Sequence, residues 1–207
     1  NLELWVRIPL AVAIAFAISF AAVPVVKTFA TKVGAIDIPD GKRRVHDHPI
    51  PRMGGLAIFL GFLLSVVLFA DITRQVRGIL IGAVLIVACG AIDDVVNLRA
   101  WIKLLVQVAA AVIAVAHGVV IEFFSNPNIF SDNELLVLGW LSIPVTVLWI
   151  VGITNSVNLI DGLDGLAVGV STIASVTMFV VALLVSEGNV ALLLAALMGA
   201  CLGFMPY

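Results

Sequence analysis

The most informative polar residues are amides and carboxylates that recur at every third position between two apolar stretches. They are Asn155, Asn158, Asp161 and Asp164. On a helix or a tight helical turn, this spacing places successive side chains along one stripe. A helix start with Asx turns would account for one or two of these residues, but not for all of them. The stripe therefore indicates a functional site rather than a helix cap.

A second polar segment contains the adjacent carboxylates Asp93 and Asp94, which directly end an apolar run. Unpaired charge near hydrocarbon is costly. Adjacent carboxylates suit Mg²⁺, which takes oxygen ligands and commonly shares them with substrate phosphates. One of the two could also act as a general base. The alternative is an ordinary helix terminus meeting water, with Asp as a turn former, and the pair alone leaves both interpretations open.

A third polar segment extends from Asp37 to Gly55 and is rich in Pro and Gly, which favour a shaped loop over regular structure. Its cations are Lys42, Arg43, Arg44 and Arg52. Such groups can bind a phosphate or diphosphate. They could instead anchor the chain against anionic lipid headgroups. The histidines, among them His46, and the Pro and Gly residues favour the binding loop.

The composition indicates which class of protein carries these three polar segments. The chain has 207 residues, of which 62% are hydrophobic and 12% charged, with a net charge of −2. Soluble domains are about 45–50% apolar and about 25% charged, so a soluble fold is excluded. The absence of low-complexity tracts and of a basic excess argues against disorder and nucleic-acid binding. The sequence therefore predicts an integral membrane protein.

Seven charge-free windows separate the polar segments. They are Ile8–Val26, Met53–Ala70, Gly78–Ile92, Leu104–Ile121, Leu135–Ile160, Gly165–Ser186 and Gly188–Tyr207. A bilayer core takes roughly 17–25 apolar residues as helix, so six windows qualify and the short third one must recruit flanking residues. Continuously apolar runs favour helices over barrel strands. We expect an all-α, polytopic transmembrane bundle of seven helices, with residues 1–207 forming a single integral membrane domain.

The distribution of cations predicts the orientation. If the segment from Lys27 to Arg52 is cytoplasmic, the segments Asp93–Lys103 and Asp161–Asp164 lie on the same side. These three segments hold eight of the eleven Lys and Arg residues. The positive-inside rule favours this arrangement, with the N-terminus outside. Trp140, near the start of the fifth window, is expected to anchor that helix at the membrane interface. Whether the protein forms a homodimer is left open.

The stripe Asn-x-x-Asn-x-x-Asp-Gly-x-Asp-Gly-Leu-Ala, beginning at Asn155, resembles the signature of the polyprenyl-phosphate N-acetylhexosamine-1-phosphate transferases. Asp93-Asp94, followed by Lys103 and Gln107, is similar to the Asp-Asp motif of that family. The loop resembles its Asp-x-Pro…Lys/Arg…His…Pro-x-Pro…Gly-Gly segment. Ile160 resembles the GlcNAc-1-phosphate branch, because the MurNAc-pentapeptide branch typically carries Thr there.

The resemblance implies transfer of a sugar 1-phosphate from a UDP-sugar to undecaprenyl phosphate, with release of UMP. It implies a bacterial inner-membrane enzyme with a cytoplasmic active face, which initiates a cell-envelope glycopolymer such as lipopolysaccharide or teichoic acid. The cofactor would be Mg²⁺, which Mn²⁺ could replace, and the partners would be the UDP-sugar, the polyprenyl phosphate and the lipid bilayer.

The resemblance also implies roles for the individual residues. Asp93 would deprotonate or orient the lipid phosphate, and Asp94 would support the metal or the nucleophile. Asn158 would contact the metal or the diphosphate, with Asn155 nearby. Asp161 and Asp164 would bind the nucleotide or sugar, or order the site. The residues expected to contact phosphate are Lys42, Arg43 and His46.

Two departures from the family pattern stand out. Asn97 occupies the last position of the longer Asp-Asp-x-x-Asp pattern, so no acidic role is assigned to it. A later Gly-Asp-x-Gly-Ser motif and a His-rich loop are absent from the sequence. We therefore expect an N-terminal fragment that is inactive alone. The alternatives are the MurNAc-pentapeptide branch of the family, or a membrane transporter with a polar site on its cytoplasmic side.

Overall fold

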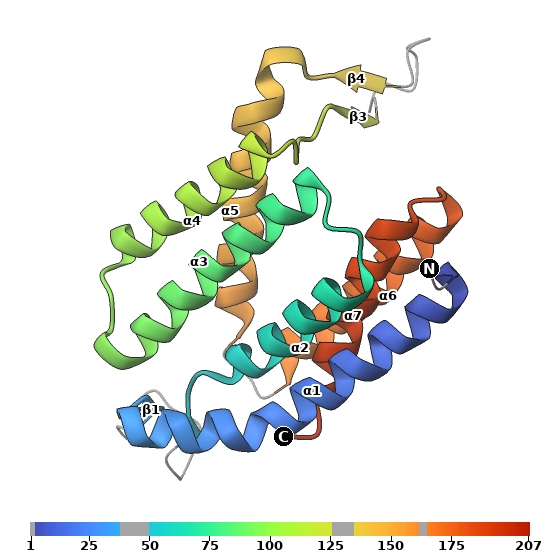
Figure 1. Ribbon diagram of the computed structural model, residues 1–207. Coiled ribbons are helices and arrows are strands. Elements are labelled where there is room, and N and C mark those ends of the chain that lie inside the picture. The colour runs from blue at the N-terminus through green and yellow to red at the C-terminus, as the bar shows by residue number, and fades with distance from the viewer. Residues whose placement is uncertain (1–2, 38–49, 126–134, 162–164) are drawn as a thin grey trace. The chain divides into compact units, whose positions relative to one another are not determined.

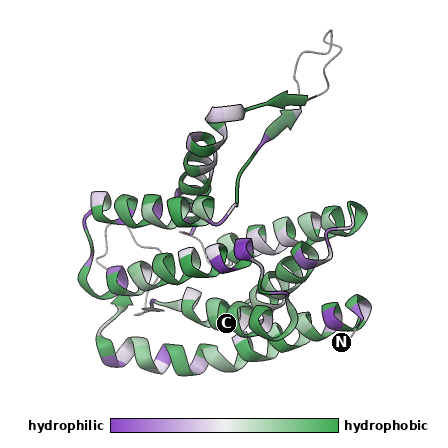
Figure 2. Cartoon of the chain, turned by 45° about the horizontal axis from the view of Figure 1, so that its top comes forward, coloured by the Kyte–Doolittle hydropathy of each residue, from purple (hydrophilic) through white to green (hydrophobic). Residues whose placement is uncertain are grey.

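The computed structural model describes residues 3–37, 50–125, 135–161 and 165–207. Within these residues the chain forms the seven predicted α-helices (Figure 1). They are α1 Leu4–Val33, α2 Gly54–Phe69, α3 Arg74–Val96, α4 Ala100–Ala116, α5 Ser142–Ile160, α6 Leu166–Leu184 and α7 Gly188–Phe204. A short 3₁₀ helix, η1 Gly139–Leu141, leads into α5. Apolar residues cover most of each helix, as Figure 2 shows, so the all-α membrane bundle is confirmed.

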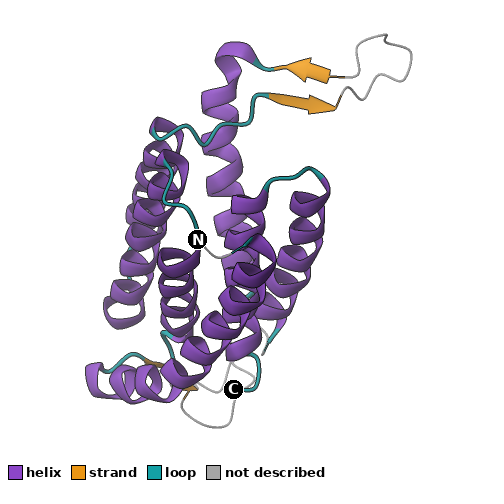
Figure 3. Ribbon diagram, turned by 45° about the vertical axis from the view of Figure 1, so that its right-hand side comes forward, coloured by secondary structure: helices purple, strands orange, loops and turns teal. Residues whose placement is uncertain are grey.

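Four short strands form two antiparallel pairs that the sequence did not predict. Strand β1 (Ile36–Asp37) pairs with β2 (Ile50–Pro51), and β3 (Phe123–Ser125) pairs with β4 (Leu135–Val137). Figure 3 shows how little of the described chain they occupy beside the helices. Both pairs connect helices, so they add to the all-α architecture without changing it.

The lengths of the helices refine the prediction of spans. Four segments within the described chain are long and apolar enough to cross a membrane: α1, α3, η1 with α5, and α6. Helix α3 has 23 residues because it recruits the charged flanks of its short apolar window, as expected. Helices α2, α4 and α7 have 16, 17 and 17 residues, which is at or just below the usual length of a span.

The chain divides into two compact units. The first comprises Asn1–Asp71, Val87–Leu98 and Ile160–Tyr207, and the second comprises Ile72–Ile86 and Arg99–Leu159. Helix α3 contributes its beginning to the second unit and its end to the first.

Small residues let the helices of the first unit approach closely. A Cβ atom on Gly199 or Gly203 of α7 would clash with the backbone of α1, at Val12 and Phe16 respectively. Buried Ser65 of α2 donates a hydrogen bond of 2.8 Å to the carbonyl of Ala11 in α1. Without a hydrophobic driving force between helices in lipid, close packing and such hydrogen bonds supply the association energy.

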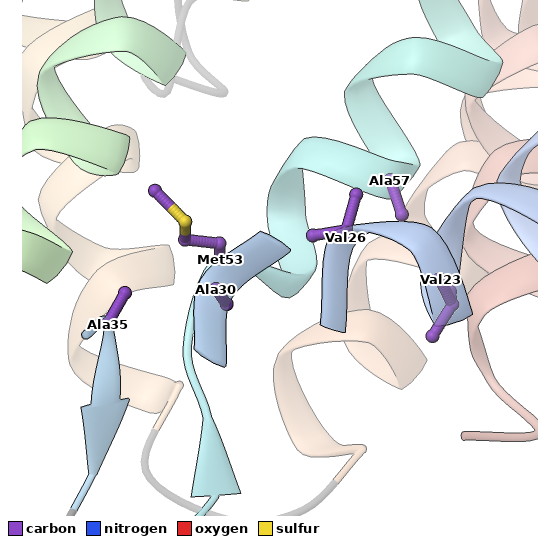
Figure 4. Close-up of a cluster of buried hydrophobic side chains, with 6 residues drawn as sticks. All are labelled: Val23, Val26, Ala30, Ala35, Met53 and Ala57. Atoms are coloured by element: carbon purple, nitrogen blue, oxygen red, sulfur yellow. The ribbon is translucent and has the colours of Figure 1, made fainter. Parts of the chain in front are cut away.

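A buried cluster fixes the end of this unit where α1, α2 and α3 meet. Its members are Val23, Val26, Ala30, Ala35, Met53 and Ala57 (Figure 4). Ala91 of α3 packs against the cluster. This contact sets the rotation of the last turns of α3, which carry the Asp pair.

Hydrogen bonds and an ion pair stabilise the other end of the first unit. Arg7 of α1 donates hydrogen bonds to the carbonyl of Phe69 and forms an ion pair of 3.1 Å with Asp71. The backbone N–H of Asp71 donates to Asn189 Oδ1 at 2.8 Å, and Asn189 Nδ2 donates back to the Asp71 carbonyl at 3.0 Å. These polar contacts therefore join the starts of α1 and α7 to the residues that follow α2.

The second unit packs α4 against the first half of α3. A Cβ atom on Gly78 would clash with the side chain of His117, and one on Gly82 would lie 3.2 Å from the carbonyl oxygen of Ala110. His117 caps the end of α4, and its Nδ1 lies 2.7 Å from the carbonyl oxygen of Ile113. The backbone N–H of Ile121 donates a 2.9 Å hydrogen bond to Thr146 Oγ1, which links the chain after α4 to α5.

Candidate functional site

Asp93 lies in the last turn of α3 and shapes the chain that leaves it. Its carbonyl accepts a 2.8 Å hydrogen bond from the N–H of Asn97, and its Oδ1 accepts one of 2.8 Å from the N–H of Leu98. Asn97 has φ of 49°, in the left-handed region that Asn tolerates well. The Asp93 side chain therefore holds the turn between α3 and α4.

Asp94 connects the end of α3 to the end of the Asp37–Gly55 segment, which we call the basic loop. Its Oδ2 accepts a hydrogen bond of 3.1 Å from the backbone N–H of Met53. Met53 precedes α2 and has φ of 73°. Asp94 is three residues from Ala91, so the contact of Ala91 with the buried cluster turns Asp94 toward Met53. Two of the three predicted motif segments are thus joined directly.

Two carboxylates in the last turn of a helix are electrostatically unfavourable, because the carbonyl end of a helix carries partial negative charge. Hydrogen bonds from the backbone amides of Leu98 and Met53 offset part of this cost. Asp93 and Asp94 are both half-buried, so neither is an ordinary surface charge. The cost of two carboxylates at a helix C-terminus is therefore only partly offset, and a catalytic role for the pair stays a prediction.

Asn155 lies on α5 in the second unit and pairs with Gln107 of α4. Asn155 Nδ2 donates to Gln107 Oε1 at 2.7 Å, and Gln107 Nε2 donates to Asn155 Oδ1 at 3.4 Å. Asn155 Nδ2 also donates to the carbonyl of Val151 at 2.8 Å. The sequence places Gln107 after Asp93-Asp94 but predicts no role for it. An amide within an apolar helix requires a partner, and that requirement is the signal that could have revealed the pair.

Asn158 lies one turn after Asn155 on α5, and Asp161 directly follows the last residue of that helix. Both side chains are exposed. The predicted stripe therefore follows consecutive turns at the end of one helix as far as Asp161. Gly165, with φ of 74°, then caps the start of α6.

Several predicted site residues lie outside the described residues. They are Lys42, Arg43 and His46 of the basic loop, and Asp164 of the stripe. Asp93, Asp94 and Asp161 belong to the first unit, and Asn155 and Asn158 to the second. The assignment of Asp94 and Asn158 as metal ligands stays a prediction.

The possible ligand groups among the described residues can be compared with the ligands that Mg²⁺ prefers. Among the described residues, no three His, Cys, Asp or Glu side chains lie together in a group able to hold a metal ion. Mg²⁺ commonly uses one or two carboxylates, substrate phosphate oxygens and water, rather than a cage made only of protein. The half-buried carboxylates of Asp93 and Asp94 fit this mode of binding.

Comparison with known proteins places the chain in a family. The model of glycosyl transferase family 4 matches residues 76–207, a stretch that contains the Asp pair and the stripe. The chain belongs to glycosyl transferase family 4. The match begins after the basic loop, so membership of this family rests on the segments from α3 onward.

Individual relatives in glycosyl transferase family 4 cover nearly the whole chain. It is 44% identical over 95% of its length to the probable undecaprenyl-phosphate N-acetylglucosaminyl 1-phosphate transferase of Bacillus subtilis. It is 35% identical over 92% of its length to the decaprenyl-phosphate N-acetylglucosaminephosphotransferase of Mycobacterium tuberculosis. A phospho-N-acetylmuramoyl-pentapeptide-transferase of Caldicellulosiruptor bescii is 31% identical over 96% of it. The chain spans 55%, 51% and 65% of these relatives, respectively.

Proposed function

We propose that the complete protein transfers N-acetylglucosamine 1-phosphate from a UDP-sugar to undecaprenyl phosphate in the bacterial plasma membrane. A phosphate oxygen of the lipid would bond to the sugar-linked phosphorus, and the bond from that phosphorus to the oxygen of UMP would break. The product would initiate a cell-envelope glycopolymer. The observation that carries the proposal is the half-buried Asp pair at a helix end, in a segment that matches glycosyl transferase family 4.

The positions of the acidic side chains support their proposed roles. Asp93 would orient the lipid phosphate or take its proton, because its carboxylate lies at the end of α3, where a spanning helix meets the headgroups. Asp94, which accepts a hydrogen bond from Met53, would hold the start of α2 beside the Asp pair. Asp161, exposed at the end of α5, would bind the nucleotide or sugar.

Mg²⁺, when bound, would supply charge neutralisation for the diphosphate and for the departing UMP. Asp94 and Asn158 would hold it together with substrate oxygens. Lys42, Arg43 and His46 would contact phosphate. The residues of the chain would otherwise act by alignment and by excluding water from the reacting phosphates.

The proposed orientation places the N-terminus outside and the Asp pair on the cytoplasmic side. It is supported by the excess of cations in the segments from Lys27 to Arg52 and from Asp93 to Lys103. A cysteine introduced by Gly41→Cys should react with a membrane-impermeant maleimide only after the cytoplasmic side is opened. Labelling of intact cells at that cysteine would contradict the orientation.

The function is tested with the complete protein in detergent, supplied with UDP-GlcNAc, undecaprenyl phosphate and Mg²⁺. UMP should appear only when the lipid phosphate is present, and chelation of Mg²⁺ should stop its release. UMP release without the lipid would mean that water is the acceptor and would contradict the proposal. Failure to release UMP with any UDP-sugar would favour a transporter.

The second candidate is transfer of phospho-MurNAc-pentapeptide. It is favoured by the 31% identity to a protein of that name over 96% of the chain. The higher identity to the N-acetylglucosamine-type relatives, 44% and 35%, and Ile160 support the first candidate. Parallel assays with UDP-GlcNAc and UDP-MurNAc-pentapeptide distinguish the two, because the preferred donor will show the higher kcat/KM.

A further inference from the structure

The β3–β4 ribbon of the second unit is apolar on both of its faces. Phe123 pairs with Val137, and Phe124 pairs with Leu136, so successive pairs present opposite faces of the ribbon. All four side chains are exposed, and Val137 is 79% exposed. A two-stranded ribbon is at best marginally stable in water by itself. Its apolar faces therefore need a covering surface.

Hydrogen bonds hold the base of this ribbon beside the first turns of α5. Ile121, two residues before β3, donates to Thr146 Oγ1 at 2.9 Å, and Thr146 is only 2% exposed. Leu138 donates to the carbonyl of Glu122 at 2.9 Å and extends the strand pairing to the base. Thr146 lies inside the segment Gly139–Ile160, which is long and apolar enough to cross a membrane. The base is therefore held beside the part of α5 that would enter a bilayer first if this segment spans it.

The ribbon extends sideways from this base. Figures 1 and 3 both show β3 and β4 running across the axis of α5 instead of continuing it. If α5 crosses the bilayer, a ribbon at this depth and in this direction lies along the membrane surface. Trp140 of η1, between the ribbon and α5, is 83% exposed. Tryptophan concentrates at the headgroup level of membranes.

We propose that the β3–β4 ribbon and Trp140 form a lipid-binding surface that lies in the headgroup and glycerol region of the bilayer, on the side where α5 begins. Lipid is the occupant because the ribbon is held at the membrane surface, where headgroups surround the protein. Both faces are apolar, so the ribbon can sink into this region without burying a charged side chain from β3 or β4. Binding of lipid covers the surface that water would otherwise meet.

The proposal is tested by the depth of single tryptophans in phosphatidylcholine vesicles that contain the complete protein. All native tryptophans, among them Trp5, Trp101, Trp140 and Trp149, are replaced by Phe, and one reporter is restored or introduced at a time. Phe123→Trp and Leu136→Trp report on the two faces, and restored Trp140 reports on η1. Restored Trp149 is the matched control, because it is exposed on α5 about 14 Å further along the helix.

Lipids brominated near the glycerol should quench Trp140 and at least one ribbon reporter more strongly than lipids brominated near the chain end. Trp149 should show the opposite preference. Iodide quenching of all ribbon reporters, with no effect of either brominated lipid, would overturn the proposal. Shielding of the ribbon that disappears as the protein is diluted with lipid would identify a second copy as the occupant, and would overturn it as well.

A second measurement keeps the test decisive if the tryptophan-free background does not fold. A nitroxide is attached to Leu136→Cys in a chain with Cys89→Ala and Cys201→Ala. The ratio of collisions with oxygen to collisions with a water-soluble nickel chelate should exceed the ratio for the same nitroxide free in water. A ratio equal to that in water would place the ribbon in water and contradict the proposal.

Discussion

Asp94 Oδ2 accepts a 3.1 Å hydrogen bond from the backbone N–H of Met53, which lies 41 positions earlier in the chain. The carboxylate pair and the end of the basic loop are therefore parts of one structure at the end of the first unit. This bond makes the position of Met53 depend on a side chain that we propose for catalysis. Variants of Asp94 can separate its charge from its role as a hydrogen-bond acceptor.

Asp94→Asn should abolish most sugar-phosphate transfer but remain more stable than Asp94→Ala, because an amide oxygen can still accept from Met53. Asp94→Ala should lose activity and also about 1–3 kcal/mol of stability, since the Met53 amide loses its acceptor. UMP release measures the transfer activity of the purified variants, and thermal unfolding measures their stability. Equal stability of Asp94→Ala and the parent would show that the bond contributes little.

Asn97, with φ of 49°, should respond to substitution according to backbone conformation. Asn97→Gly should be neutral or slightly stabilising, because Gly adopts the left-handed region without steric cost. Asn97→Val should destabilise the turn by about 1–2 kcal/mol. Denaturation of both variants in the same detergent compares them, and a Val variant as stable as the Gly variant would contradict the turn geometry.

The pair formed by Gln107 and Asn155 should behave as one interaction between α4 and α5. Gln107→Leu and Asn155→Leu should each destabilise the protein, and the double variant should lose less than their sum. We expect a coupling energy of about 0.6 kcal/mol and at most about 1.7 kcal/mol, the average and the maximum measured for hydrogen bonds between membrane helices. A double-mutant cycle of unfolding free energies measures it, and strict additivity would mean that the residues act independently.

Gly199 should be intolerant of even one added methyl group, because a Cβ atom there meets the backbone of α1 at Val12. Gly199→Ala should destabilise the contact of α7 with α1 by about 1–3 kcal/mol. Gly169→Ala on α6 is the matched control, since a Cβ atom there meets open space. That control should gain about 0.5–1 kcal/mol from helix propensity. Similar unfolding temperatures for the two variants would contradict the packing of α1 on α7.

Charge-free windows predicted the helices because a membrane span leaves a strong and local signal in the sequence. The short window Gly78–Ile92 became part of the long helix α3, as its charged flanks allowed. The strand pairs β1–β2 and β3–β4 were missed, since each contains only two or three residues per strand and no period-2 alternation. Helix boundaries also shifted: α1 continues past Val26 through Lys27 and Lys32 to Val33.

Motifs identified the candidate residues but not all of their partners. Asp93 and Asp94 were predicted for their chemistry, and the structure adds that each also binds a backbone amide. The partner of Asn155, Gln107, lies 48 positions away. Such a pairing depends on how α4 packs against α5, and spacing along one helix holds no information about it.

Asp93 at the end of α3 and Asp161 at the end of α5 are the acids that we propose act on the transferred phosphate. UMP release from UDP-GlcNAc, dependent on undecaprenyl phosphate and Mg²⁺, should fall by orders of magnitude in Asp93→Asn and Asp161→Asn of the complete protein. Asp71→Asn, at the exposed carboxylate of the Arg7 ion pair, should keep near-parental activity. Parental activity in Asp93→Asn or Asp161→Asn, or an equal loss in Asp71→Asn, would contradict these catalytic roles.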